Sequence, residues 1–263
     1  MSRNGRENVV AKPYLSPVAF RFLAHRGLTV GSEQQPIDEN TEPAFARALE
    51  AGATYLEVDV RASRDGLSVV CHDQDLVRVA GYPAKVAELD WQALSAIQLR
   101  HGAHLMSLDA LLKRFPQARL NIDIKSSDAI VPTVLAIEQN RATDRVLISS
   151  FSERRRSAAV RLLPGVATSS SAQRLLAVWL AHKLGSQALL RRALRGLDAM
   201  QIPVSRGPLR FASESFIAAV KRNGVELHYW TINDPKQALE LRARGANGIV
   251  SDRIDLMVAA LAE

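Results

Sequence analysis

Residues 55–60 read YLEVDV, a stretch typical of a β-strand with one apolar and one acidic face. Side chains alternate across a strand, so Glu57 and Asp59 share one face while Leu56, Val58 and Val60 share the other. Two carboxylates on one face repel each other unless a cation lies between them. The pattern therefore indicates either a hard metal ion such as Ca²⁺ or Mg²⁺ held by oxygen ligands, or two solvated acids on an exposed strand.

Apolar runs of this kind recur along the chain and alternate with helical patterns, which favours parallel strand–helix units. We expect eight strands, over residues 19–25, 55–60, 118–125, 145–151, 165–169, 199–204, 225–232 and 247–251. Helix starts are indicated by Asn40-Thr41-Glu42-Pro43, by Ser152 and by Asp234-Pro235. Eight such units in 263 residues predict an α/β fold, the TIM (β/α)₈ barrel, with residues 1–263 forming one domain.

Residues 61–117 depart from the simple strand–helix unit. The dipeptide Asp65-Gly66 is typical of a hairpin turn, which would send residues 67–73 (LSVVCHD) back beside YLEVDV. His72 would then return to the end of the second strand that carries Glu57 and Asp59. Residues 74–106 are expected to form a small insertion over the barrel rim, with a short helix near residues 91–99.

Polar residues stand where the expected strands end. In barrels of this type the chemistry lies at the carboxyl ends of the strands and in the loops that follow. These positions hold His25 in the first strand, Glu57 and Asp59 in the second, Asp123 and Lys125 in the third, and Trp230 in the seventh. Asp123 and Lys125 share one strand face, so a third carboxylate and a cation face the same interior. We therefore expect these residues to converge on one rim.

The chain is basic, and its cations are unevenly distributed. It has 34 Lys and Arg against 27 Asp and Glu, a net charge of +7, which favours an anionic substrate or partner. Residues 154–197 contain nine Lys and Arg and no acid. A nucleic-acid-binding protein is the alternative suggested by this charge. The basic segments lack aromatic residues that alternate with the cations, and the sequence lacks a recognised nucleic-acid-binding motif. No nucleic-acid partner is therefore expected.

Within the acid-free segment, apolar residues recur at helical spacing. They are Leu175, Leu176, Trp179, Leu180 and Leu184, with cations on either side. Outer barrel helices that pack this stripe on the sheet are one interpretation. The other is that residues 154–197 make a peripheral contact with anionic phospholipid.

The remaining features indicate the cellular compartment of the protein and disfavour functional sites beyond the barrel rim. No run of 18 or more apolar residues occurs and the amino-terminal residues lack a signal-peptide pattern, so we expect a cytoplasmic protein. Cys71, the single cysteine, is expected to be a buried core residue. His101 and His104 flank a glycine in an expected loop, which disfavours a helical zinc pair. His182 and His228 are expected on a helix surface and in strand packing, with a substrate role for His228 left open.

Several motifs resemble, in order and spacing, those of the glycerophosphodiester phosphodiesterase family, within the phosphatidylinositol-phospholipase-C-like superfamily. They are AHRG (24–27), ENT (39–41), LEVDV (56–60), RDG (64–66), VVCHD (69–73), NIDIK (121–125), ISSF (148–151), WTIN (230–233) and GIVSD (248–252). The resemblance runs from Leu23 to Asp255. It implies a TIM barrel, one divalent metal ion, Ca²⁺ or Mg²⁺, and hydrolysis of glycerophosphodiesters such as glycerophosphocholine or glycerophosphoethanolamine to glycerol 3-phosphate and an alcohol.

The resemblance also implies roles for individual residues. The acid/base pair would be His25 and His72, and the metal ligands Glu57, Asp59 and Asp123. The substrate-binding residues would be Arg26, Glu39, Asn40, Lys125 and Trp230. The alternative function within the same superfamily is a phospholipase D-like enzyme acting on lysophospholipids at a membrane surface, with a cyclic phosphate intermediate. The sequence does not predict the oligomeric state.

Four departures from the family pattern stand out. Asp123 replaces the usual Glu, which shortens the third metal ligand by one methylene. Residues 28–38 (LTVGSEQQPID) are inserted between HRG and ENT and are expected to remodel the mouth of the site. Ser107 and Ile254 each replace a proline, away from the chemistry.

Overall fold

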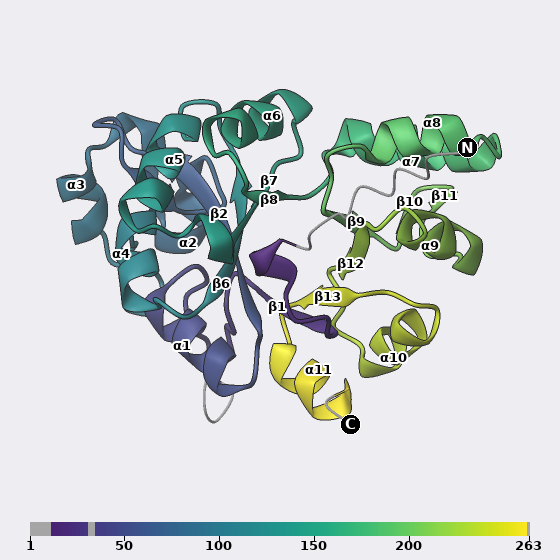
Figure 1. The fold of residues 1–263 in the computed structure, drawn as a ribbon. Helices are drawn as coiled ribbons and strands as arrows, with labels where there is room; N and C mark the ends of the chain where they lie inside the picture. Colours follow the sequence, from purple (N-terminus) through teal and green to yellow (C-terminus); the bar gives the residue numbers. More distant parts are fainter. Residues whose placement is uncertain (1–11, 31–34, 262–263) are drawn as a thin grey trace.

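The computed structural model describes residues 12–30 and 35–261, and its centre is a closed barrel of eight parallel strands (Figure 1). The sheet runs in the order β8-β7-β6-β2-β1-β13-β12-β9, and a parallel bridge between Ser169 and Ala199 joins its two ends. The strands are β1 (Arg21–His25), β2 (Tyr55–Ala62), β6 (Arg119–Ile124), β7 (Val146–Ser149), β8 (Ala167–Thr168), β9 (Ala199–Pro203), β12 (Glu226–Trp230) and β13 (Gly248–Ser251). All eight predicted strands are present, so the predicted TIM barrel is confirmed.

Helices cover the outside of the barrel. They are α1 (Glu42–Glu50), α4 (Leu108–Arg114), α5 (Ile130–Gln139), α6 (Glu153–Leu162), α7 (Ala172–Lys183), α8 (Gln187–Leu194), α9 (Glu214–Lys221), α10 (Pro235–Ala243) and α11 (Ile254–Leu261). The predicted helix starts are correct, because Thr41, Ser152 and Asp234 are the N-caps of α1, α6 and α10. Among the described residues, none of the helices combines the length and apolar character needed to cross a bilayer.

Residues 63–107 form a lobe beside β2. The predicted hairpin is present, since β3 (Ser68–Val70) pairs antiparallel with β2. The lobe then contains β4 (Asp75–Leu76), α2 (Val77–Ala80), β5 (Tyr82–Lys85), a 3₁₀ turn (Val86–Glu88) and α3 (Trp91–Ala96). It has its own small core, in which Cys71 is buried and burial raises the pKa of its thiol to about 12. Asp38, in the loop after β1, accepts N–H bonds from His101 and Ala103 and ties the lobe to the barrel.

The amino-terminal end of the barrel is closed by a short 3₁₀ helix, Pro13–Leu15. Tyr14 is buried and packs edge-on against Tyr55, with ring centroids 4.9 Å apart. The Tyr55 hydroxyl donates to the Tyr14 carbonyl at 2.9 Å. Because one end is plugged in this way, the carboxyl end is the open one.

The barrel interior holds a buried ionic cluster above this plug. Glu226 accepts a hydrogen bond from Arg21 at 2.9 Å and lies 3.0 Å from Nε2 of His228. Burial opposes ionisation of Glu226, but hydrogen bonds from His228 and Arg21 outweigh it and lower its pKa to about 2. His228 is therefore a buried partner of Glu226, which agrees with the strand-packing interpretation.

Candidate active site

The register of the parallel strands brings the predicted site residues together at the carboxyl rim. His25 is level with Glu57 across β1 and β2, and Asp59 is level with Asp123 across β2 and β6. Residues that are level in a parallel pair and point inward are neighbours in the barrel. The histidine and the three carboxylates, far apart in sequence, therefore share one rim.

The centre of the rim is an ionic network around Asp59. The Nζ atom of Lys125 lies 2.7 Å from Oδ1 of Asp59 and 2.6 Å from Oδ2 of Asp123. On the other side, Nε of Arg26 is 3.1 Å from Oδ2 of Asp59, and the Asn40 amide donates to the same oxygen at 3.3 Å. Burial opposes ionisation of Asp59, but Lys125 and Arg26 lower its pKa, so this carboxylate is held charged.

Glu57 and Asp123 are less well compensated. Burial and the neighbouring charge of Asp59 raise the pKa of Glu57 to about 8, although Oε2 of Glu57 accepts the Arg26 backbone N–H at 3.2 Å. Burial also raises the pKa of Asp123 despite Lys125. Its Oδ1 is buried and has no hydrogen-bond partner within residues 12–30 and 35–261. A further cation at the rim would therefore stabilise the ionised forms of Glu57 and Asp123.

His25 is oriented by a carboxylate from the other end of the sequence. Its Nδ1 donates to Oδ1 of Asp252 at 2.6 Å, and the Asn233 amide donates to the other carboxylate oxygen at 2.8 Å. Burial lowers the pKa of His25, but the hydrogen bond to Asp252 and the charge of Glu57 outweigh it, so the pKa is raised. Asp252 was not predicted as a site residue, although it ends the GIVSD motif.

His72 is oriented in the same way, by its sequence neighbour. Its Nδ1 donates to Oδ1 of Asp73 at 2.7 Å. Arg78, in α2, donates to Asp73 at 2.5 Å and makes two bonds to Glu39, of 2.9 and 2.6 Å. Glu39 in turn accepts from Arg26 at 3.1 Å. Arg78, which no motif indicated, thus connects the lobe to both the histidine and the arginine of the site.

The loop that carries Arg26 and Asn40 has an unusual backbone. Arg26 has a φ of 57° and Asn40 a φ of 58°, in the left-handed region that non-glycine residues seldom adopt. Gly27 has a φ of 88°, and a Cβ there would lie 2.7 Å from Ala44. The Asn40 N–H donates to the Arg26 carbonyl at 2.9 Å, so the HRG and ENT motifs hold Arg26 and Asn40 side by side, next to Asp59. Residues 31–34 of the inserted segment lie outside the described residues.

An aromatic wall flanks the network. Trp230, at the end of β12, lies with its ring centroid 5.8 Å from that of Phe151, which follows β7. Nζ of Lys125 is 5.6 Å from the Phe151 ring. Phe151 is exposed and was not predicted as a site residue, although it belongs to the ISSF motif. The two rings offer an apolar surface beside the charged centre.

The donor set fits a hard divalent cation in its chemistry. Glu57, Asp59 and Asp123 are buried oxygen donors, and Oδ1 of Asp123 is without a partner among the described residues. In the side-chain arrangement of the described residues, however, no three His, Cys, Asp or Glu converge closely enough to hold an ion. Lys125 instead lies between Asp59 and Asp123. The carboxylates fit the ion provided that the Lys125 ammonium moves aside.

An open barrel rim with buried acids, cations for an anion and two carboxylate-oriented histidines defines a TIM-barrel enzyme suited to phosphoric diester hydrolysis. The family model described as "Glycerophosphoryl diester phosphodiesterase family" matches residues 25–256. The chain belongs to this family of enzymes, which hydrolyse glycerophosphodiesters.

One curated relative shares this assignment, and two solved structures share the fold. A Mycobacterium tuberculosis protein named "Probable glycerophosphodiester phosphodiesterase 2" is 40% identical over 236 residues, which cover 89% of this chain and 88% of that protein. A solved glycerophosphodiester phosphodiesterase from Agrobacterium tumefaciens has a TM-score of 0.76 at 23% identity, covering 93% of this chain and 100% of that one. An Oleispira antarctica phosphodiesterase, solved in complex with the product sn-glycerol-3-phosphate, has a TM-score of 0.73 at 24% identity, covering 92% and 96% of the two chains.

Proposed function

We propose that this enzyme hydrolyses small polar glycerophosphodiesters, such as glycerophosphocholine and glycerophosphoethanolamine, to glycerol 3-phosphate and an alcohol. The observation that carries the proposal is the pair of histidines at one rim, each held through Nδ1 by a carboxylate. His25 is held by Asp252 and His72 by Asp73. This arrangement leaves Nε2 of each ring to exchange a proton with the substrate, so one histidine acts as base and the other as acid.

The cations of the site would bind the phosphate. Arg26 and Lys125 are the two that face the carboxylates, and both would stabilise charge developing on the phosphoryl oxygens. Glu39 and Asn40 hold this part of the site in place, and Trp230 with Phe151 would bound the glycerol or the departing alcohol.

A divalent ion, Ca²⁺ or Mg²⁺, completes the proposed site. Enzymes of this family are generally metal-dependent. Glu57, Asp59 and Asp123 would hold the ion, which when bound supplies Lewis-acid polarisation of a phosphoryl oxygen. Lys125 would then be released from the acids toward the phosphate. The shorter Asp123, in place of the family's Glu, leaves more room for the ion or a water ligand.

A panel of diesters tests the proposal. With Mg²⁺ or Ca²⁺ present, kcat/KM for glycerophosphocholine or glycerophosphoethanolamine is expected to exceed that for lysophosphatidylcholine by at least about tenfold. The reason is that the charged rim interacts more favourably with a compact polar substrate than with one that carries an acyl chain. Phosphorus NMR distinguishes glycerol 3-phosphate, lysophosphatidic acid and a cyclic phosphate. Absence of glycerol 3-phosphate with every diester and either metal would refute the proposal.

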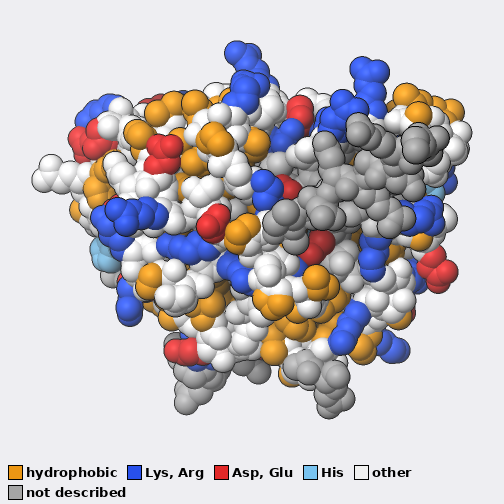
Figure 2. Space-filling model, in the orientation of Figure 1, with side chains coloured by type: hydrophobic (Ala, Val, Ile, Leu, Met, Phe, Trp, Pro, Cys, Tyr) orange, Lys and Arg blue, Asp and Glu red, His pale blue; other side chains and the backbone are white. Residues whose placement is uncertain are grey.

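A second candidate function, lysophospholipid hydrolysis at a membrane, is favoured by the outer face of α7. Leu176, Leu180 and Leu184 are spaced four residues apart and have exposed fractions of 47%, 46% and 71%. Leu175 and Trp179 instead pack against the core, so α7 carries one packed and one exposed apolar stripe. Lys and Arg side chains project along the upper edge of Figure 2, where Figure 1 places α6 and α7.

Vesicle co-sedimentation tests this second candidate. Binding is expected to increase with the fraction of anionic lipid, since each cation near such a surface contributes about 1 kcal/mol. Replacing Leu176, Leu180 and Leu184 together by serine is expected to weaken binding at least about tenfold through lost apolar insertion. Leu239→Ser, at an equally exposed leucine on α10, is the control. Vesicle binding that does not change with the fraction of anionic lipid would exclude membrane docking through α7. An equal loss of vesicle binding in the triple serine variant and in Leu239→Ser would exclude it as well.

A further inference from the structure

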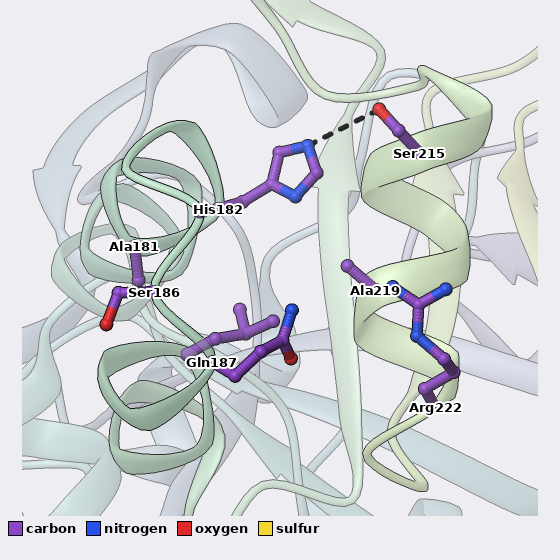
Figure 3. A pocket seen from close by; sticks show the side chains of 9 residues that line it. Ala181, His182, Ser186, Gln187, Ser215, Ala219 and Arg222 are labelled. Carbon is purple, nitrogen blue, oxygen red and sulfur yellow. Dashed lines mark hydrogen bonds between the residues drawn. The ribbon is translucent and has the colours of Figure 1, made fainter.

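A cavity of about 240 Å³ lies between the α7–α8 hairpin and α9, and none of the active-site residues lines it (Figure 3). Its walls come from the end of α7, the start of α8 and one side of α9. Leu190 and Ala219 form apolar parts of the wall. The volume is below the range of about 300–1,000 Å³ common for drug-sized ligands, so the cavity suits a small molecule.

Hydrogen-bond donors line the cavity, and no Asp or Glu does so among the described residues. Figure 3 shows His182 on one side, Gln187 reaching from α8, and Ser215 and Arg222 on α9 and at its end. Nε2 of His182 is 3.4 Å from Oγ of Ser215. Within residues 12–30 and 35–261, neither the Gln187 amide nor the Arg222 guanidinium makes a hydrogen bond or ion pair. Gln187 and Arg222 are exposed residues, so both donor groups are available to a ligand at the open side of the cavity.

The surroundings of the cavity are positively charged. Burial lowers the pKa of His182 because it disfavours a charged imidazole, and the positive charges of Lys183 and Arg222 lower this pKa further. Phe216 packs edge-on against the His182 ring, with centroids 5.4 Å apart, and brings no charge. An anion in the cavity would bind to Arg222 and reverse this repulsion.

We propose that this cavity is a second anion site, which binds the phosphate group of a small phosphomonoester. Arg222 would form paired hydrogen bonds to two phosphate oxygens, and Gln187, Ser215 and His182 would donate to the others. Because Gln187, Ser215 and Arg222 are exposed residues, these bonds would form at the open side of the cavity, and Leu190 and Ala219 would line its apolar side. The site lies apart from the barrel rim, so its occupant need not be the substrate.

Imidazole NMR tests the proposal on the intact protein. The chain has six histidines, and His182→Gln identifies the His182 signals. Inorganic phosphate and glycerol 3-phosphate are expected to shift these signals and to raise the His182 pKa. Arg222→Gln is expected to weaken phosphate binding at least about tenfold, since a charge-assisted bond is lost. Arg192→Gln removes the same charge from a neighbouring exposed position outside the cavity and is expected to leave affinity within about twofold.

The outcomes separate the proposal from its alternatives. Diester hydrolysis is expected to stay unchanged in Arg222→Gln, which shows that the fold is intact and that the sites are distinct. If vesicles with phosphatidic acid shift the His182 signals while free phosphate and glycerol 3-phosphate do not, the site takes a lipid phosphate, and the assignment to a small phosphomonoester is overturned. His182 signals that respond to none of these ligands, or an equal loss of affinity in Arg222→Gln and Arg192→Gln, would overturn it.

Discussion

Replacing His25 or His72 by alanine is expected to lower kcat by about a thousandfold, within the range of 10²–10⁴ for lost general acid/base catalysis. Each imidazole is fixed by a short bond from Nδ1 to a carboxylate, of 2.6 Å to Asp252 and 2.7 Å to Asp73. No other described side chain has this arrangement at the rim. Removal of either imidazole therefore leaves one proton-transfer step without its general acid or base.

His104→Ala is the matched control, because His104 is an exposed histidine of the lobe. Its kcat is expected to stay within about twofold of the parent, as for most exposed substitutions. The three variants are compared by steady-state kinetics on the same diester, with thermal melting to show that each is folded. If His25→Ala and His72→Ala both retain kcat within tenfold of the parent, the acid/base assignment is wrong.

The barrel could be predicted because its signals are local. Each strand has its own apolar run, and its predicted ends differ from the observed ones by at most two residues. Helix starts are set by nearby side chains, as where Oγ of Ser152 accepts the Arg155 N–H. Convergence of His25, Glu57 and Asp123 on one rim then follows from the geometry of parallel strands, not from any long-range contact.

The partners of the site residues could not be predicted, because they depend on long-range packing. Asp252 lies 227 residues from His25, and Arg78 reaches Glu39 from a short helix with no recognisable motif. The position of Lys125 between two acids depends on the register that makes Asp59 level with Asp123. Asp252 ends the GIVSD motif and Phe151 ends the ISSF motif, so membership of these motifs was the sequence feature that could have indicated a role in the site. Short exposed pieces, such as the β10–β11 ribbon (Ser205–Arg206 and Leu209–Arg210), also gave no signal.

Removing divalent metal with a chelator is expected to lower activity at least about a thousandfold, with recovery on adding Mg²⁺ or Ca²⁺, because several kcal/mol of transition-state stabilisation is lost. The carboxylates at the rim outnumber the cations that touch them: Lys125 is shared by Asp59 and Asp123, and Oδ1 of Asp123 has no described partner. A metal ion would neutralise the remaining negative charge of these carboxylates and would free Lys125 to bind the phosphate.

The Lys125→Met variant allows metal binding to be measured independently of catalysis, because thermal melting detects the bound ion without substrate turnover. Without metal, Asp59 and Asp123 lose the ammonium that joins them, and the variant is expected to lose about 3–5 kcal/mol of stability, as for a broken buried ion pair. Saturating Mg²⁺ or Ca²⁺ is expected to restore about 2.7 kcal/mol at a hundredfold excess over the dissociation constant. Activity should stay low even then, since the phosphate has lost a cation.

Lys85→Met is the control for this experiment, since Lys85 pairs with Glu88 at an exposed site on the lobe. Its melting temperature is expected to respond to metal as the parent's does, because an exposed pair contributes at most about 1 kcal/mol. A larger metal-induced stabilisation in Lys125→Met than in Lys85→Met would mean that the ion and the ammonium compete for the same oxygens. If neither ion changes the melting temperature of the parent or of Lys125→Met, then Glu57, Asp59 and Asp123 are not the metal ligands.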